Sequence, residues 1–172
     1  PVYLMPLGGR SEEYNLNVQE VAKAIGMDSR IGSKFLQVSV GFGGSCFQKD
    51  ILNMVYIAKS LGHNEDADYW HQVILMNNHQ RDRFAKKIIK TLYSTVSGKT
   101  ITFLGWAFKK DTNDTRESAA IYVADSLMDE QATINVYDPI VTDTQMQSDL
   151  NNLKKTLKSG QIFGLLFTFC IQ

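Results

Sequence analysis

The sequence predicts an α/β fold in which a helical first half is followed by a half with parallel strands. Apolar residues recur at helical spacing through much of the chain before Tyr93, whereas two short strand-like segments, Thr100–Leu104 and Ala132–Tyr137, flank a further helical pattern. A strand, a helix and a strand in that order form a βαβ unit, whose strands are parallel. The pattern changes at Ser97-Gly98-Lys99, so we expect the boundary between the halves near residue 97.

The first predicted helix follows residues 1–16, which show no consistent period and predict an irregular arm. Asn17 is a favourable N-cap, apolar side chains follow at helical spacing, and Gly26 ends the run. Next, the β-branched residues and glycines of Ile31–Ser45 predict an extended segment that enters a glycine-rich loop.

Two further helices are predicted in the first half. Cys46 opens one of them, Gly62 sits where its C-terminal cap belongs, and its apolar face comprises Ile51, Leu52, Met54, Val55, Ala58 and Leu61. The other runs from about Asp66 to Tyr93 and would be about 40 Å long. A helix of that length in a small protein packs against a second subunit or forms a central core helix, and the pattern supports both interpretations equally.

The second half is predicted to begin with a buried parallel strand, Thr100–Leu104. A helix over Glu117–Glu130 and a second strand over Ala132–Tyr137, closed by Asp138-Pro139, complete the βαβ unit. Beyond it the pattern weakens: Thr142–Lys158 is polar and suits a helix, and the apolar run Gln161–Ile171 suits a strand.

Composition excludes several classes of protein. The chain has 172 residues, 44% of them hydrophobic, with 18 basic and 18 acidic side chains, so we expect a folded core rather than disorder. Its longest uncharged apolar stretch, Ile162–Ile171, is about half the ~20 residues that a membrane-spanning helix needs. Zero net charge argues against nucleic acid as a partner. Cys46 and Cys170 suggest neither a disulfide framework nor a metal site, and the first residues lack a secretory signal, so we expect a cytoplasmic protein.

The most informative motif is the run from Gly41 to Asp50, GFGGSCFQKD. Its glycines let the backbone approach a ligand, and the start of the following helix favours an anion such as a phosphate. At that helix start, the dipole and Lys49 favour the thiolate of Cys46, which makes this residue a candidate nucleophile. Asp50 follows one helical turn later and could orient water near the sulfur. The alternative is a cysteine that only packs as a small apolar residue, and local physics supports the two equally.

A second motif extends from Gly105 to Ser118, GWAFKKDTNDTRES. It follows a predicted strand, where open α/β sheets bind their ligands. Lys109 and Arg116 suit anionic oxygens, and Phe108 offers a flat apolar contact for a base or ring. The alternative is a solvated polar loop that only caps the next helix.

Together these two motifs resemble the nucleotide-sugar dehydrogenases, the UDP-glucose/GDP-mannose dehydrogenase family, over Asn17 to about Pro139. The family pattern implies an N-terminal NAD-binding Rossmann domain, a central helical dimerisation region and a C-terminal Rossmann-like UDP-sugar domain. On this pattern residues 17–96 form the central region with the catalytic cysteine loop, and residues 97–172 form part of the Rossmann-like UDP-binding domain. The whole would be an α/β protein, with the helical region first and an incomplete parallel α/β domain second.

The resemblance also implies roles for individual residues. Cys46 matches a nucleophile that forms a thiohemiacetal and then a thioester, and Asp50 matches a carboxylate that positions the hydrolytic water. Arg30 matches a residue that reaches the substrate across a dimer. The substrate contacts implied are Arg30, Phe35, Leu36, Gln37, Val38, Ser39, Val40, Gly41, Phe42, Gly43, Phe108 and Lys109. The cofactor contacts implied, toward NAD, are Cys46, Phe47, Gln48, Lys49 and Arg116.

The function implied by the resemblance is NAD-dependent oxidation of UDP-glucose to UDP-glucuronate, in a homo-oligomer formed through the long helix. We expect this chain to be inactive alone, because the dinucleotide fingerprint of the family is not in the sequence. Two alternatives remain open: a non-catalytic dimerisation or binding module, including a truncated pseudoenzyme, and a dehydrogenase of another nucleotide sugar. No metal, nucleic acid or membrane partner is expected.

Overall fold

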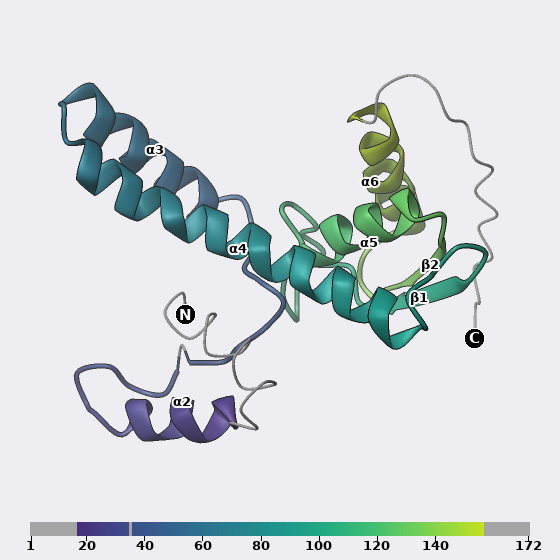
Figure 1. Cartoon of the computed structure of the whole chain (residues 1–172), viewed down its shortest axis with the longest axis horizontal. Helices are drawn as coiled ribbons and strands as arrows, with labels where there is room; N and C mark the ends of the chain where they lie inside the picture. The colour runs from purple at the N-terminus through teal and green to yellow at the C-terminus, as the bar shows by residue number, and fades with distance from the viewer. Residues whose placement is uncertain (1–16, 35, 157–172) are drawn as a thin grey trace. The chain divides into compact units, whose positions relative to one another are not determined.

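The computed structural model describes residues 17–34 and 36–156, with side chains up to residue 152. Its elements, in order, are α2 (Val18–Gly26), α3 (Phe47–Ser60), α4 (Asn64–Thr91), β1 (Thr100–Leu104), α5 (Ala119–Asp129), β2 (Thr133–Tyr137) and α6 (Asp143–Thr156) (Figure 1). The chain is therefore α/β, with helices first and a parallel βαβ unit second, as predicted. The irregular arm 1–16, the apolar run Gln161–Ile171 and Cys170 lie outside the described residues.

The described residues form two compact units. Unit 1 comprises the described residues up to Gly41 together with Cys46–Arg81, and unit 2 comprises Phe42–Ser45 and the described residues from Asp82 onward. The division falls within α4, so this helix contributes to both units. The domain boundary near residue 97 stays a prediction.

In unit 1, each helix begins and ends where local signals place it. The Asn17 side chain caps α2 by accepting a hydrogen bond from the Gln19 N–H at 2.9 Å. After α3, Gly62 has φ +80°, a left-handed conformation that glycine adopts without strain and that ends a helix. The long helix is confirmed, and it begins and ends two residues earlier than the pattern predicted.

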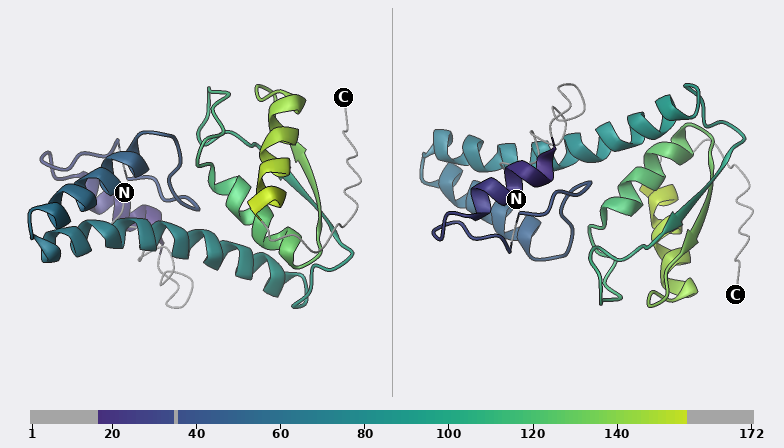
Figure 2. Two further views of the ribbon diagram at one scale, coloured as in Figure 1. Left: turned by 90° about the horizontal axis from the view of Figure 1, so that it is seen from above. Right: turned by 90° about the horizontal axis from the view of Figure 1, so that it is seen from below.

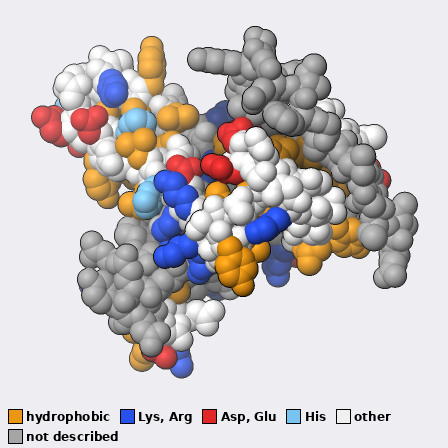
Figure 3. Space-filling view, turned by 45° about the vertical axis from the view of Figure 1, so that its right-hand side comes forward, with side chains coloured by type: hydrophobic (Ala, Val, Ile, Leu, Met, Phe, Trp, Pro, Cys, Tyr) orange, Lys and Arg blue, Asp and Glu red, His pale blue; other side chains and the backbone are white. Residues whose placement is uncertain are grey.

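Helices α3 and α4 form a hairpin in unit 1, lying alongside each other in all views (Figures 1 and 2). Its buried apolar side chains are Ile51 and Val55 of α3 and Ala67 and Ile74 of α4. Of the six apolar side chains that form the predicted face of α3, the structure buries two, Ile51 and Val55. Large side chains that stay exposed on the hairpin and its turn are Leu52, Met54, Tyr56, Ile57, Leu61, Tyr69, Trp70 and Leu75. Hydrophobic side chains are visible at this surface in Figure 3.

Unit 2 contains the βαβ unit. Strands β1 and β2 pair in parallel, with Ile101 opposite Ile134 and Phe103 opposite Val136. Helix α5 contacts both β2 and α6, and both helices lie beside the strands in Figure 2. Buried apolar side chains here include Val96, Trp106, Val123, Ala124, Leu127, Ile134, Val141, Met146 and Leu150.

Two details of unit 2 differ from the prediction. Strand β1 alternates between exposed and half-buried residues, and Leu104 is 81% exposed, so it is not the fully buried strand expected. In the described part of the chain β1 pairs only with β2, which leaves its second edge uncovered by a strand. Helix α5 begins two residues later than predicted, because Glu117 has φ +55° and Ser118 is the extended N-cap.

Long-range polar contacts fix the loops of unit 2. The Trp106 indole Nε1–H donates to the Asp149 carboxylate of α6 at 3.0 Å. The Lys99 ammonium donates to the backbone carbonyls of Leu92 and Thr95, where α4 ends. None of the described helices is long and apolar enough to cross a membrane. Nor do three or more His, Cys, Asp or Glu side chains within the described ranges gather where they could hold a metal ion.

Candidate active site

Cys46 is the N-cap residue of α3, with φ −88° and ψ −54°, and it is exposed. Its carbonyl accepts a hydrogen bond from the Asp50 N–H at 2.9 Å, which confirms that the two residues are one helical turn apart. Both side chains therefore belong to the first turn of one helix, and Asp50 is also exposed. The N–H groups of Phe47, Gln48 and Lys49 lie in the turn that has no earlier helical carbonyl to bind, a place that favours an anion.

The segment before Gly41 is anchored at one point in unit 1. Leu36 is buried, and its Cδ1 lies 3.1 Å from the position of a Cβ built on Gly26. Because that side chain packs on the end of α2, the predicted ligand contact at this position would come from its backbone. Gln37, Val38 and Ser39 are exposed, Val40 is half-buried, and Phe35 is outside the described residues.

Three buried polar residues of α4, Asn77, Gln80 and Arg81, were missed by sequence reasoning. A Cβ on Gly41, which has φ +150°, would lie only 2.7 Å from the Asn77 Oδ1 and 3.6 Å from the Arg81 Cγ. Asn77 and Arg81 therefore pack near Gly41, where the glycine segment begins. The signal for the three polar residues in the sequence is the i, i+3, i+4 spacing of polar side chains within an otherwise amphipathic helix.

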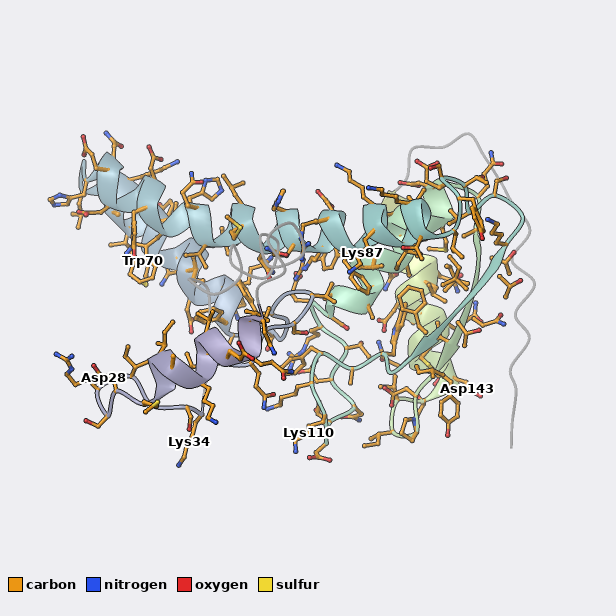
Figure 4. The ribbon with its side chains drawn as sticks, turned by 60° about the horizontal axis from the view of Figure 1, so that its bottom comes forward. Asp28, Lys34, Trp70, Lys87, Lys110 and Asp143 are labelled. Carbon is orange, nitrogen blue, oxygen red and sulfur yellow. The ribbon has the colours of Figure 1, made fainter. Side chains whose placement is uncertain are left out.

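Arg30 lies in the turn that follows α2, together with Asp28, which is labelled in Figure 4. The Asp28 Oδ1 accepts the Arg30 backbone N–H at 2.9 Å and the Nε–H at 3.0 Å, and its Oδ2 accepts the Nη2–H at 2.6 Å. The side-chain hydrogen bonds from Arg30 lower the pKa of Asp28. The guanidinium is thus held by a carboxylate two residues earlier while 87% of the Arg30 side chain stays exposed.

In unit 2, Gly43 and Gly44 pack against the loop between β1 and α5. The Gly44 N–H donates to the Arg116 carbonyl at 2.8 Å, and a Cβ on Gly44 would lie 2.9 Å from the Phe108 ring. A Cβ on Gly43 would lie 2.5 Å from the Glu117 carbonyl oxygen and 2.8 Å from the Phe108 Cβ. The glycines are therefore required for this close approach. Phe108 contacts the glycine segment with its ring, a contact that the sequence did not reveal.

The same loop carries Lys109 and Arg116. The Lys109 Nζ lies 5.4 Å from the centre of the Phe108 ring, a cation–π distance. Asp114 accepts the Arg116 backbone N–H at 3.0 Å, its Nε–H at 2.9 Å and its Nη2–H at 2.7 Å. The side-chain hydrogen bonds of Arg116 are the main reason that the pKa of Asp114 is lowered to about 2, and the Lys109 charge adds to the effect.

Asp138, which follows β2, fixes the start of this loop. Its Oδ2 accepts the N–H groups of Trp106 at 2.7 Å and Ala107 at 3.2 Å, and its Oδ1 accepts those of Ile140 and Val141 at 2.9 Å each. Burial alone would raise the pKa of this carboxyl, but the four backbone hydrogen bonds lower it. Sequence reasoning used Asp138 only as the end of a strand. The Asp-Pro pair was the available signal for a carboxylate that turns the chain.

Two family models match the chain. Residues 7–79 match the central domain of the UDP-glucose/GDP-mannose dehydrogenase family, and residues 102–162 match its UDP binding domain. Together these matches cover well over half of the sequence. This chain belongs to the UDP-glucose/GDP-mannose dehydrogenase family.

Within this family, the chain is 57% identical over 141 residues to the UDP-glucose 6-dehydrogenase of Drosophila melanogaster, covering 82% of this chain and 30% of that one. It is 55% identical over 143 residues to UDP-glucose 6-dehydrogenase 5 of Oryza sativa subsp. japonica, covering 83% and 30% of the two chains. The chain thus spans about 30% of the length of these curated relatives.

Solved structures of the family agree with the fold. A UDP-glucose dehydrogenase from the archaeon Pyrobaculum islandicum matches with a TM-score of 0.78 and 27% identity, over 98% of this chain and 36% of that one. A GDP-mannose dehydrogenase from Pseudomonas aeruginosa matches with a TM-score of 0.54 and 21% identity, over 86% and 31% of the two chains, which supports the fold alone.

The family match is broader than the resemblance over Asn17 to about Pro139 indicated. It begins at residue 7 and continues to residue 162, so that estimate was too narrow at both ends.

Proposed function

We propose that this chain carries the cysteine loop and the UDP-sugar-binding part of an NAD-dependent UDP-glucose 6-dehydrogenase. Such an enzyme oxidises the C6 hydroxyl of UDP-glucose to the carboxylate of UDP-glucuronate. The observation that carries the proposal is the placement of Cys46: exposed, at the N-cap of α3, directly after a glycine segment and one turn before Asp50. The identity of more than half the aligned residues to named UDP-glucose 6-dehydrogenases supports the choice of sugar.

In the proposed mechanism Cys46 acts once the sugar C6 is an aldehyde. Its thiolate attacks the carbonyl carbon, and the new C–S bond gives a thiohemiacetal. Loss of a hydride and a proton from that adduct leaves a thioester. The helix start supports this role, because it places the exposed Cys46 side chain at the first turn of α3.

Asp50 acts in the last step. Water adds to the acyl carbon of the thioester, the C–S bond breaks, and the sugar carboxylate and the Cys46 thiolate are released together with two protons. Asp50 would orient this water and accept one of these protons, the other passing to solvent, because it is exposed on the same first turn of α3 as the cysteine. Residues toward the substrate would be Arg30, Lys109, Phe108 and the backbone of residues 35–43.

NAD would supply the acceptor for the two hydrides that leave the sugar. The residues implied by the family pattern fit an anionic dinucleotide: Arg116 is a cation, and the first-turn N–H groups of residues 47–49 belong to a helix start. On this proposal, this chain contributes to NAD binding a positive charge and hydrogen-bond donors beside Cys46.

We also propose that the exposed apolar side chains of the α3–α4 hairpin pack against a second copy of the chain. Tyr56 is 72% exposed and Tyr69 70% exposed, and such side chains seldom gather on a surface that meets only water. This choice favours the subunit-packing interpretation of the long helix over the core interpretation. The cytoplasmic location expected from the sequence belongs to the same proposal.

The test is calorimetric titration of UDP-glucose and of NAD, separately, into the purified chain. We expect Lys109→Ala to weaken UDP-glucose binding about tenfold or more, because a charge-assisted hydrogen bond to phosphate is lost. Cys46→Ala is the control and should bind UDP-glucose normally while losing reaction with a thiol reagent at that position. UDP-glucose binding that is unchanged in Lys109→Ala would contradict the proposed placement of the substrate.

Mixing the chain with a full-length relative distinguishes the main alternative, a non-catalytic binding module, from the proposed enzyme function. The module interpretation predicts mixed oligomers with a full-length relative and no effect of Cys46→Ala on that relative's rate of NAD reduction. If the chain alone reduces NAD with UDP-glucose, both the module interpretation and the expectation of inactivity are wrong. Preference for another nucleotide sugar in the same titrations would favour a different substrate.

A further inference from the structure

Asp138 stands at the carboxyl end of β2, the edge at which open α/β sheets bind their ligands. In dinucleotide-binding βαβ units, an acidic side chain accepts a hydrogen bond from a ribose hydroxyl of the ligand. A carboxylate that follows the second strand of a βαβ unit is therefore a candidate for the same contact. The hydrogen bonds that Asp138 makes within the chain decide whether it can bind a ribose.

Backbone donors already fill the Asp138 carboxylate. An ionised carboxylate has about four lone-pair sites. The Oδ2 accepts the N–H groups of Trp106 and Ala107, and the Oδ1 accepts those of Ile140 and Val141. Two of these donors belong to the loop that follows β1, and two belong to the turn that follows β2. A ribose hydroxyl would have to displace one of them, which would leave a backbone N–H without its acceptor.

The neighbouring N–H groups at the start of the loop also have acceptors. The Gly105 N–H donates to the Tyr137 carbonyl at 2.7 Å, and the Phe108 N–H donates to the Asp114 carbonyl at 3.0 Å. Together with the two hydrogen bonds to the carboxylate, these contacts give each of the four consecutive donors of residues 105–108 an acceptor. The course of the backbone into the next residue is therefore set by contacts within unit 2.

The Trp106 side chain anchors the loop in the core of unit 2. It is fully buried, its ring meets the Phe103 ring edge-on with centroids 5.9 Å apart, and its indole donates to Asp149 at 3.0 Å. Lys109 follows three residues later and is exposed, with its ammonium 5.4 Å from the centre of the Phe108 ring. An exposed cation on a backbone that is already held in place reduces the ordering cost of binding an anion.

We propose that Asp138 is a positioning residue for Lys109. It holds two N–H groups at the start of the loop, so that the lysine ammonium meets phosphate oxygens of the nucleotide, and it does not bind the ribose. This inference rests on the proposed function, which places Lys109 beside the sugar nucleotide. It gives a role in binding to a residue that the sequence motifs identified only as the end of a strand.

Three roles of Asp138 predict three different outcomes for Asp138→Asn. Charge alone predicts tighter binding of any phosphate, because a negative charge is removed. A ribose contact predicts weaker binding of UDP-glucose and no weakening for inorganic pyrophosphate, which has no ribose. Positioning predicts weaker binding of both by a similar factor, because the amide accepts fewer of the four N–H groups and the phosphate contact of Lys109 is disturbed.

The experiment is calorimetric titration of UDP-glucose and of inorganic pyrophosphate into the full chain and its variants. We expect Asp138→Asn to weaken the binding of both about fivefold, equivalent to about 1 kcal/mol. Asp143→Asn is the matched control, because it removes an exposed carboxylate at the start of α6, labelled in Figure 4, and should leave both affinities unchanged or slightly higher. Equal or tighter binding by Asp138→Asn, or weakening confined to UDP-glucose, would overturn the inference.

A double-variant comparison separates positioning from a general loss of stability. In a Lys109→Ala background, Asp138→Asn should weaken pyrophosphate binding no further, because the contact that it positions is already lost. A second loss of similar size in that background would show that Asp138 acts by another route, and the inference would be wrong.

Amide hydrogen exchange tests the positioned backbone in the unaltered chain. We expect the N–H groups of Trp106 and Ala107 to be protected before ligand is added, and UDP-glucose to change their exchange less than about twofold. Unprotected N–H groups that become protected only with ligand would overturn the inference, even if Asp138→Asn failed to fold.

Failure of the proposed function gives a different result. Pyrophosphate binding that depends on Lys109, with UDP-glucose bound no more tightly than pyrophosphate, would contradict the choice of substrate, and the pyrophosphate comparison would still decide the role of Asp138. A chain that binds neither anion would overturn both.

Discussion

The two units stabilise themselves in different ways. In unit 1, the α3–α4 hairpin buries four apolar side chains of its two helices and leaves larger ones, such as Tyr56 and Leu75, exposed. In unit 2, the βαβ unit and α6 bury Trp106, Leu127 and Leu150 almost completely. Unit 2 therefore has a hydrophobic core of its own, whereas the hairpin of unit 1 leaves much of its apolar surface exposed, the surface that we propose packs against a second copy.

The two units also differ in what their polar side chains contact. Unit 2 uses carboxylates as fixed points: Asp138 accepts four backbone N–H groups, and Asp149 accepts the Trp106 indole. In unit 1 the buried polar side chains lie on α4, where Asn77 and Arg81 pack near Gly41. The loop with Lys109 and Arg116 is therefore held by contacts within unit 2, whereas the hairpin of unit 1 leaves large apolar side chains exposed.

The strongest test compares one leucine from each unit. Leu127→Ala, in the core of unit 2, should lower the free energy of unfolding by about 3–4 kcal/mol, because it leaves a cavity. Leu75→Ala, at a position that is 45% exposed on α4, should change it by less than about 0.5 kcal/mol. Urea unfolding followed by Trp106 fluorescence, with Trp70→Phe in both variants, measures the difference.

For self-association we expect the reverse order. Leu75→Ala should weaken the oligomer in sedimentation equilibrium, and Leu127→Ala should not do so while the chain remains folded. Equal stability losses in the two variants would contradict the contrast between the units.

Asp138→Ala should cost about 3 kcal/mol of unfolding free energy, since four backbone donors lose their acceptor. Asp138→Asn should cost less because one oxygen still accepts. The pKa of Asp138 is lowered in the folded chain, so its ionised form stabilises the fold above the unfolded pKa of about 3.9, and this contribution is lost as pH falls through the lower folded value. Urea midpoints from pH 7 downward measure it. A pH dependence that Asp138→Asn leaves unchanged would exclude this carboxyl as a source.

Gly43→Ala should destabilise unit 2 by about 2 kcal/mol, because the added Cβ would meet the Glu117 carbonyl at 2.5 Å and backbone cannot easily move. Gly32→Ala in unit 1 is the matched control. Its Cβ would meet nothing within 4 Å, and only the left-handed φ of +73° opposes it, at about 1 kcal/mol. A larger loss in Gly32→Ala would show that the glycine segment does not pack as described.

The smallest expected effect concerns two carboxyl groups of unit 2 and the order in which they take up a proton. Burial, followed by repulsion from Asp129, raises the pKa of Asp125, and the hydrogen bonds from Arg116 lower the pKa of Asp114 to about 2. On acidification, Asp125 should therefore protonate before Asp114. The stabilisation from the Asp114–Arg116 hydrogen bonds should be lost as pH falls below about 3.9 toward 2. Carboxyl ¹³C titration measures both groups. Protonation in the opposite order would contradict the hydrogen bonding between Asp114 and Arg116.

Local signals predicted much of the fold. Asn17 and Gly62 mark helix ends through their own capping chemistry, and the two strands were found as short strand-like segments, the second ended by Asp138-Pro139. The hydrogen bonds between Asp114 and Arg116 and the packing of the glycines were not predicted. The sequence does not show where the Asp114 oxygens point, and the contact between Gly43 and Glu117 joins residues far apart in the chain.

The sequence by itself determined the succession of elements, the family and the residues that carry charge and a thiol, since these depend on residue type and on neighbours within a turn or two. Only the tertiary structure decided which oxygens hold Arg30 and Arg116, that Phe108 packs on Gly44, and that Asp138 ties the ends of two strands together. The physical reason is that hydrogen bonds and close packing depend on distance and direction. Residue type does not give the direction of neighbouring side chains such as Asp114 and Arg116, and only folding brings distant groups such as Trp106 and Asp138 within reach.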